Sequence, residues 1–462
     1  MTKIKYQILA DELAVAILSK KLPINARLPS VRELMRQHQL SLATVTNALH
    51  ILEERGLVEP RGKAGYFVKP PAPNDISEIA KVAAPAPHAR SQAGLQAMTA
   101  SIPNWGPAED LFPEQRWQSL LGSIIRRHPF LSTRHAQAYG HPRLRAELAR
   151  RSAENGCFLK EEELIVTQGA TEALLLALRA TTEVGAKVLV QAPVSVLYSR
   201  LLETFTLTPV TVHNSVDAPD FLAEVQTILE SENPPKVFLL VANYHFPTGA
   251  LMPLLVKRQL LRLAEKHGVT IIEDDVYGDL QHDGARPLTL KSFDLKGNVI
   301  YVNSCSKTLA PGLRIGWLAA GNWRERIAYL KNASASSVNE LSQLVLAEFL
   351  AQGSHVPHLR KFRQQLKTRS GEYLSILRLV LGNTVKLADM PGGYSYWLPL
   401  PGKISVDEIQ SQLLQHWPLL DKADTPQVAL VSHGLCVNTS IPLTDPLRQS
   451  LTAFCFYLRG QY

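Results

Sequence analysis

SCSKTLAPGLRIGW, residues 304–317, places one lysine among small hydroxyl residues and next to a Pro-Gly turn. The preceding stretch, NVIYVNS, is an apolar run typical of a buried strand. We therefore expect Lys307 in a polar turn at a strand end. A lysine that is desolvated in such a turn can form a Schiff base with an aldehyde. The stretch predicts a site for an aldehyde cofactor.

Pyridoxal 5'-phosphate (PLP) is the commonest cofactor of this kind, and it requires a lysine, a carboxylate for its ring nitrogen and donors for its phosphate. Asp274, in IIEDDVYG, is the candidate for the ring nitrogen, and Tyr277 is the candidate for the phenolic oxygen. Backbone amides that open a helix bind anions, and QGATEALLLAL predicts such a helix start. The candidate phosphate donors are Gly169, Ala170, Thr171, Ser304, Ser306 and Arg314.

Strand-like and helical patterns alternate from about residue 101 onward. The runs ELIVTQG, KVLVQAP, KVFLLVAN, VTIIEDD and NVIYVNS predict strands, and helical patterns such as LLVKRQLLRLAEKHG lie between them. This order favours a mainly parallel sheet with helices on both faces. After Trp317 the pattern is mostly helical, and PGGYSYWLPL and VALVSHGLCV then predict strands of a smaller α+β subdomain.

The first 70 residues are basic and show a different pattern. The net charge of the chain is +8, and residues 1–70 contain 11 Lys and Arg against 6 Asp and Glu, which suggests a polyanionic partner. A helix is predicted over residues 4–20, a second is capped by Ser30 with Glu33, and a third spans Leu42–Arg55. RGKAG then predicts the basic tip of a hairpin. Together these elements predict a winged helix-turn-helix domain.

We therefore expect a multidomain chain. The predicted parts are a winged-helix domain (1–70), a Pro/Ala-rich linker (71–100) and an α/β body (101–462), whose large subdomain is about 135–330 and whose small subdomain is 331–462 with 101–134. The four cysteines have no metal-site spacing, so no metal is predicted and reduced thiols of a cytoplasmic protein are expected. Apolar runs are too short to cross a membrane.

Two known families resemble this chain. Leu28-Pro29-Ser30-Val31-Arg32-Glu33-Leu34 and Gly65-Tyr66-Phe67-Val68 resemble the winged-helix domain of the GntR family of bacterial regulators. The ordered motifs QGATEAL, FPTG, EDDVYG, SCSKTLAPGLRIGW and PGGYSYW resemble fold-type I PLP enzymes of the aspartate-aminotransferase class. A winged helix fused to such a body resembles the MocR-type branch of the GntR family.

The resemblance implies further contacts. It implies a homodimer with PLP between the subunits, in which Tyr139 reaches the neighbour's phosphate, and it makes Asn243 a candidate cofactor contact. It also implies binding of a double-stranded DNA operator through Arg32, Ser41, Thr44, Arg61 and Lys63.

Several positions depart from the enzyme pattern. Ser195 stands where an aromatic residue usually stacks on the cofactor ring, Phe246 replaces an asparagine, and Thr452 stands at the position assigned to the substrate-binding arginine. In the head, Leu42 replaces the usual arginine. These departures favour a regulator that senses PLP, an amine or an amino acid. Two alternatives are an active aminotransferase that uses another arginine, either Arg448 or Arg134, and a regulator that has lost its cofactor.

Overall fold

The computed structural model divides the chain into two compact units, which we call the head (Met1–Gln92) and the body (Ala93–Tyr462). Each unit is described by itself. The linker predicted at 71–100 lies outside the described residues. The described residues are 5–18, 21–69, 105–129, 131, 133, 136–334, 337–382, 384–385, 387–401, 404, 408–409, 411–413, 428–431 and 434–462.

The head is a winged helix. Its elements are α1 (Lys5–Leu18), α2 (Val31–His38), α3 (Leu42–Glu54), β1 (Val58–Pro60), the 3-10 turn η1 (Gly62–Ala64) and β2 (Tyr66–Val68). The predicted capping box is confirmed, because the Glu33 backbone N–H donates to Ser30 Oγ (3.3 Å) and the Ser30 N–H donates to Glu33 Oε2 (2.7 Å). The apolar faces of the three helices meet in one core that contains Leu9, Leu34 and Leu49.

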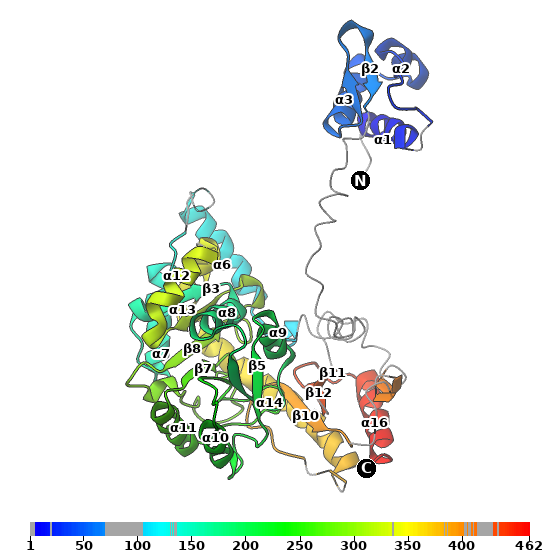
Figure 1. The fold of residues 1–462 in the computed structure, drawn as a ribbon. Helices are drawn as coiled ribbons and strands as arrows, with labels where there is room; N and C mark the ends of the chain where they lie inside the picture. Colours follow the sequence, from blue (N-terminus) through cyan, green and yellow to red (C-terminus); the bar gives the residue numbers. More distant parts are fainter. Residues whose placement is uncertain are drawn as a thin grey trace. The chain divides into compact units, whose positions relative to one another are not determined.

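The body is built on a seven-stranded sheet in the order β3-β9-β8-β7-β6-β4-β5 (Figure 1). Its strands are β3 (Leu164–Thr167), β4 (Lys187–Gln191), β5 (Thr208–Val212), β6 (Val237–Leu240), β7 (Thr270–Asp274), β8 (Val299–Ser304) and β9 (Gly316–Ala319). Strands β5, β4, β6, β7 and β8 are parallel, and β9 runs antiparallel between β8 and β3. All five predicted runs form strands of this sheet.

Two strands of the sheet, β5 and β9, were not predicted, and the reason in each case lies in the local sequence. β5 lies at the edge of the sheet, contains Pro209 and begins with exposed residues, so it lacks the apolar run of a buried strand. β9 follows directly after the lysine turn, so its residues do not stand out as a separate apolar run.

Helices cover both faces of the sheet. The described helices of the body, including those of the C-terminal subdomain, are α6 (Glu114–Arg127), α7 (Pro142–Glu154), α8 (Gly169–Thr181), α9 (Val196–Thr204), α10 (Phe221–Leu229), α11 (Leu254–His267), α12 (Arg324–Ser334), α13 (Glu340–Ala351), α14 (His355–Leu381) and α16 (Asp445–Arg459). Short 3-10 turns are η2 (Glu109–Leu111), η3 (Glu161–Glu163), η4 (Lys291–Phe293), η5 (Pro311–Leu313) and η6 (Gly321–Trp323).

Successive strand residues enter opposite cores, because side chains alternate across a sheet. Ile272 and Ile300 pack with α8 and α12 on one face, whereas Ile271 and Val299 pack with α10 and α11 on the other. None of the helices formed by the described residues has the length and hydrophobicity needed to cross a membrane.

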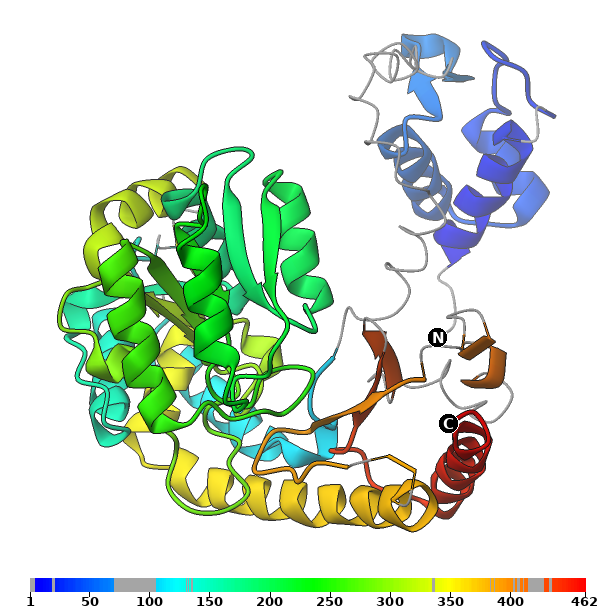
Figure 2. The same ribbon diagram turned by 60° about the horizontal axis from the view of Figure 1, so that its bottom comes forward.

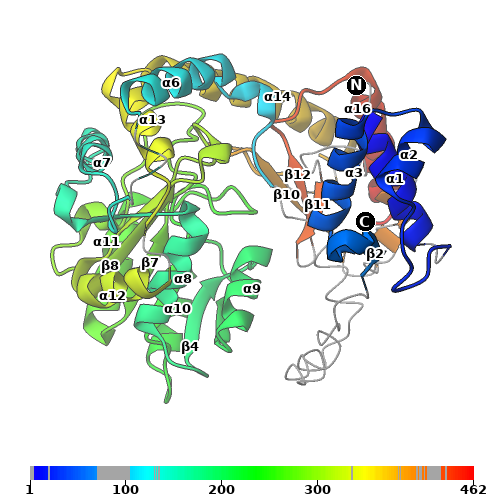
Figure 3. The ribbon, with the colours of Figure 1, turned by 90° about the horizontal axis from the view of Figure 1, so that it is seen from above.

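The C-terminal subdomain contains an antiparallel sheet in the order β10-β12-β11 and the helix α16. Its strands are β10 (Ser395–Pro399), β11 (Val428–Val431) and β12 (Gly434–Asn438), so the predicted strand VALVSHGLCV is two paired strands. The long helix α14 joins the two parts of the body, as Figures 2 and 3 show. Leu359 packs in the core beside β3, and Leu377 packs in the core beside α16.

One segment packs differently from the prediction. We expected residues 101–134 in the small subdomain. Residues 105–108 do contact that subdomain, but Trp117 and Ile124 of α6 pack with Leu144 of α7 and Trp317 of β9. The helix therefore belongs to the core of the large sheet, because its apolar stripe is buried there.

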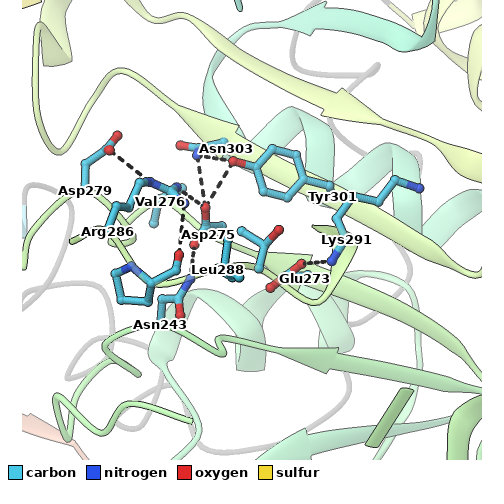
Figure 4. Close-up of polar contacts among 12 residues, drawn as sticks. Asn243, Glu273, Asp275, Val276, Asp279, Arg286, Leu288, Lys291, Tyr301 and Asn303 are labelled. Atoms are coloured by element: carbon cyan, nitrogen blue, oxygen red, sulfur yellow. Dashed lines mark hydrogen bonds and ion pairs between the residues drawn. The ribbon is translucent and has the colours of Figure 1, made fainter. Parts of the chain in front are cut away.

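A network of buried charges lies at the end of β7 (Figure 4). Asp275 pairs with the guanidinium of Arg286, which also donates to Asp279 Oδ1 (2.9 Å). The Tyr301 hydroxyl and the Asn243 side-chain amide donate to Asp275 at 3.0 and 2.8 Å. Arg286 and Asp275 are almost completely buried. Each charge has lost its water, and the attraction to its partner must offset that cost.

Loss of one buried partner should destabilise the body strongly. We expect Arg286→Met to lower the free energy of unfolding by about 3–5 kcal/mol, because Asp275 would be left buried and unpaired. All six tryptophans lie in the body, so their fluorescence during urea unfolding measures this change in the full chain.

The matched control is Lys367→Met. Its ion pair with Asp283 (2.7 Å) is exposed, and such pairs contribute about 0–1 kcal/mol. Equal effects of the two substitutions would contradict a structural role for the buried network.

Candidate functional site

A cavity of about 310 Å³ lies at the carboxyl ends of the parallel strands. This edge is where open α/β sheets bind ligands, and the volume is at the lower end of the range for small-molecule sites. The structure brings eight predicted cofactor residues into its lining: Lys307, Asp274, Tyr277, Ser304, Ser306, Arg314, Ala170 and Thr171.

Lys307 lies in the turn after β8 and extends into this cavity. Its Nζ donates a hydrogen bond to the backbone carbonyl of Trp105. Burial lowers the pKa of the Lys307 amine to about 8, the carboxylate of Asp274 opposes this shift, and Arg314 adds to it. A larger fraction of Lys307 is therefore neutral near pH 7 than of a solvent-exposed lysine, and the neutral amine is the nucleophilic form.

Asp274, the last residue of β7, is held by a residue whose role the sequence did not reveal. The Tyr198 hydroxyl, on α9, donates to Asp274 Oδ2 at 3.0 Å, and both groups are buried. Burial raises the pKa of the Asp274 carboxyl to about 6, while the hydrogen bond from Tyr198 limits the rise. Asp274 is thus mostly ionised at neutral pH and can accept a hydrogen bond from a protonated ring nitrogen.

The opposite end of the cavity has the character of an anion site. Gly169 opens α8 with φ +78°, a conformation that favours glycine. A Cβ at Gly169 would lie 2.7 Å from Arg314 Nη2, which places the guanidinium against the first turn of the helix. Gly316 allows β9 to approach this turn, because a Cβ there would lie 2.3 Å from the Gly169 carbonyl carbon. Helix amides, Arg314 and the hydroxyls of Ser304 and Ser306 suit a phosphate group.

Three predicted cofactor residues are not part of the lining, namely Gly169, which is described above, Asn243 and Tyr139. The Asn243 side chain is fully buried, donates to Asp275 (2.8 Å) and accepts from Lys257 Nζ (2.6 Å). It serves the buried charge network instead. The Tyr139 hydroxyl accepts from Asn332 Nδ2 (3.1 Å), so within one chain it does not reach the cavity.

The position assigned to the substrate-binding arginine also needs correction. Thr452 is on α16, and its hydroxyl donates to the carbonyl of Arg448 one turn earlier. Arg448 itself lies 3.9 Å from Glu372, and neither residue lines the cavity. The position predicted on this helix therefore lies outside the cavity that contains Lys307. Arg134, the other candidate arginine, lies outside the described residues.

An aromatic wall closes the side of the cavity next to Lys307. Trp105 contacts Phe246 edge-on (ring centroids 5.9 Å apart), and Phe246 lies nearly parallel to Tyr277 (6.2 Å, 16°). Ser195 lines the cavity too, where it caps α9 by accepting from the Tyr198 N–H (3.2 Å). Trp105 was not predicted as part of the site, because no sequence pattern indicates that a tryptophan 202 residues before Lys307 contacts it.

The predicted DNA-binding residues all belong to α2, the start of α3 and the hairpin. Arg32 is exposed on α2, while the Ser41 hydroxyl caps α3 and contacts Thr44 Oγ1 (2.8 Å). Arg61 is bound within the head by Glu59 and by Asn25 (both 2.8 Å). The side chain of Lys63 lies outside the described residues. Among the residues whose side chains are described, no His, Cys, Asp and Glu cluster suits a metal.

Comparison with known proteins agrees with this geometry. Residues 5–68 match the family model of bacterial regulatory proteins of the gntR family, and residues 125–421 match that of aminotransferase class I and II. The uncharacterized HTH-type transcriptional regulator YdcR of Escherichia coli is 32% identical over 89% of this chain and 90% of its own length. The uncharacterized HTH-type transcriptional regulator YjiR of E. coli is 28% identical, and 97% of each chain is covered.

The chain belongs to the GntR family, with the MocR-like combination of a helix-turn-helix domain and an aminotransferase class I and II domain. Two solved aminotransferases share the fold of the body. Kynurenine aminotransferase from Pyrococcus horikoshii, in complex with PMP, has a TM-score of 0.72 at 20% identity and covers 83% of this chain and 98% of its own. LysN from Thermus thermophilus, complexed with N-(5'-phosphopyridoxyl)-L-leucine, has a TM-score of 0.70 at 22% identity, with 80% and 95% covered.

The GntR-type head predicts a measurable role for Arg32. If Arg32 contacts a phosphate, Arg32→Ala should weaken binding to all DNA sequences alike and reduce the slope of log K against log salt by about one. Fluorescence anisotropy with labelled duplexes at several salt concentrations measures both.

Arg258→Ala is the control, because this arginine packs over the Phe293 ring in the body (4.8 Å). An unchanged salt slope in Arg32→Ala would place Arg32 outside the DNA interface.

Proposed function

We propose that this protein is a cytoplasmic, dimeric transcriptional regulator whose head binds an operator and whose body holds PLP through Lys307. The observation that supports this most strongly is the combination, in one cavity, of a lysine of lowered pKa, a buried carboxylate and an anion site. PLP, when bound, supplies an aldehyde that bonds covalently to amines and a ring that withdraws electrons.

Each end of the cavity fits one part of that cofactor. Arg314 and the first turn of α8 would bind the phosphate, and Asp274 would accept a hydrogen bond from the protonated ring nitrogen. Tyr277 lines the same cavity as Asp274 and Lys307, where its hydroxyl would contact the phenolic oxygen. Tyr198 orients Asp274 through its hydrogen bond and so acts as a positioning residue.

The same cavity lacks features that rapid transamination needs. Ser195 presents no ring for stacking, and Phe246 presents no hydrogen-bond donor. A substrate carboxylate needs a charge-assisted, bidentate partner to offset its loss of water. We therefore propose that binding of PLP, or of an amine to the PLP-bearing body, changes the affinity of the head for DNA. Such regulation requires the ligand to favour one arrangement of the dimer over another.

Lys307→Ala should abolish covalent attachment of the cofactor and leave the head folded. After incubation with PLP and desalting, we expect visible absorption in the native chain and none in the variant. DNA binding should persist in the variant but should no longer change when PLP is added.

The control for this substitution is Lys266→Ala, which removes a lysine with 66% of its side chain exposed. Visible absorption that remains in desalted Lys307→Ala would contradict the assignment of the lysine. Conversion of the band by an amino acid into that of the amine form of the cofactor would instead show an aminotransferase.

The two pKa shifts predict the pH dependence of cofactor binding. Attachment requires neutral Lys307, so its rate should rise with pH through about 8 and then level off. Retention requires ionised Asp274, so affinity should fall as the pH drops below about 6. Tyr198→Phe removes a hydrogen bond that lowers the Asp274 pKa and should therefore move the acid limb to higher pH.

Stopped-flow absorption measures the attachment rate, and equilibrium dialysis measures retention. Tyr329→Phe serves as a control because Tyr329 is 74% exposed on α12. An acid limb at the same pH in Tyr198→Phe and native protein would contradict the role of Tyr198.

A further inference from the structure

Trp105 occupies the reactive end of the cavity with both its side chain and its backbone. The residue is only 5% exposed. Its indole N–H donates to Ser395 Oγ at 2.9 Å, and its carbonyl accepts from Lys307 Nζ. Any group that approaches the Lys307 nitrogen from this side therefore meets the indole ring or the carbonyl oxygen of Trp105.

The position of Trp105 is fixed by the residues that follow it. The Gly106 carbonyl accepts from Asn438 Nδ2 at 2.9 Å, and the Ala108 N–H donates to Ser440 Oγ at 2.9 Å. Both partners lie at or just after the end of β12. Residues 105–108 are thus attached to the small subdomain, and the indole is held in place by more than its own contacts.

The surroundings of the indole are apolar. Phe246 packs against it, Tyr277 and Tyr394 extend the aromatic wall (centroids 6.1 Å apart), and Cys436 is fully buried in the same cluster. A carboxylate placed here would lose its water without gaining an ionic partner, which is strongly unfavourable. The Trp105 carbonyl oxygen would repel it further, because a carbonyl accepts hydrogen bonds and cannot donate them.

An amine behaves differently at this position. Its N–H groups can donate to the Trp105 carbonyl, as Lys307 Nζ does. Among the described residues, the cationic side chains that line the cavity besides Lys307 are Arg314 and Arg200. Arg314 lies against Gly169, and Arg200 belongs to α9, so both cations come from elements other than those that supply Trp105 and Phe246.

We propose that Trp105 determines the ligand class of this cavity, admitting compact amines without a carboxylate and excluding α-amino acids. An α-amino acid carries its carboxylate two bonds from its nitrogen, so the nitrogen cannot reach Lys307 without bringing the carboxylate to the aromatic wall. The indole excludes the carboxylate because it occupies the space and because the carboxylate would lose its water there. This proposal rests on the proposed function, because it specifies which amines reach the PLP-bearing lysine.

The test is titration of the full-length, PLP-loaded protein with ethylamine, L-alanine and L-aspartate, followed by visible absorption and by isothermal calorimetry. We expect the native protein to respond to ethylamine and to neither amino acid. Trp105→Ala should bind L-alanine at least about tenfold more tightly than the native protein, because water can then solvate the carboxylate. Trp105→Phe should largely retain the exclusion.

Trp323→Phe is the matched control, since its indole N–H donates to Thr270 Oγ1 (3.2 Å) away from the cavity. A native protein that binds L-alanine as tightly as ethylamine overturns the proposal, and loss of that binding in Arg200→Ala would assign the carboxylate to Arg200. Trp105→Ala with an intact visible band and no gained affinity for L-alanine also overturns it. A native protein without the visible band contradicts the proposed function and, with it, this inference.

Discussion

Loss of water at the carboxyl edge of the sheet is the constraint on which the chemistry of the body depends. Parallel strands bring their ends to one edge, so the groups that follow β3, β7 and β8 converge there whatever their distance in sequence. Burial pushes the pKa of Lys307 down and that of Asp274 up, toward each other. An amine close to neutrality therefore lies in the same cavity as an ionised carboxylate, and this pair can engage an electrophile with a basic ring nitrogen.

Three successive carboxylates at the end of β7 show how strand alternation separates roles. Glu273 is buried and accepts the backbone N–H groups of Leu290 and Lys291, while its neighbour Asp274 turns to the opposite face and the cavity. Asp275 returns to the first side and joins the ion pair with Arg286. Because side chains alternate along a strand, Glu273 and Asp275 make structural contacts inside the protein, whereas Asp274 faces the cavity. The charge network below the cavity supports the strand end that presents Asp274.

Linear motifs were sufficient for the parts of the site that come from single turns. The lysine turn, the Asp274 strand end and the helix start at Gly169 each contain their own signal, since each combines a strand pattern with a polar turn. Contacts across the fold had no such signal. Tyr198 reaches Asp274 from 76 residues away, and its place on α9 gives it a direction that no spacing rule predicts. The same holds for Thr452 on α16, which does not line the cavity, because spacing in the sequence does not show on which side of a subdomain a helix residue lies.

The sequence by itself determined the two-part architecture, the winged helix, five of the seven central strands and the placement of Lys307 and Asp274 near strand ends. Local patterns were enough for these, because turn chemistry, capping and periodicity act over a few residues. Only the tertiary structure decided that Trp105 closes the cavity, that Asn243 belongs to the buried network and that α6 packs on the large sheet. These outcomes depend on which surfaces lose water together, and that is a property of the packed chain rather than of any segment.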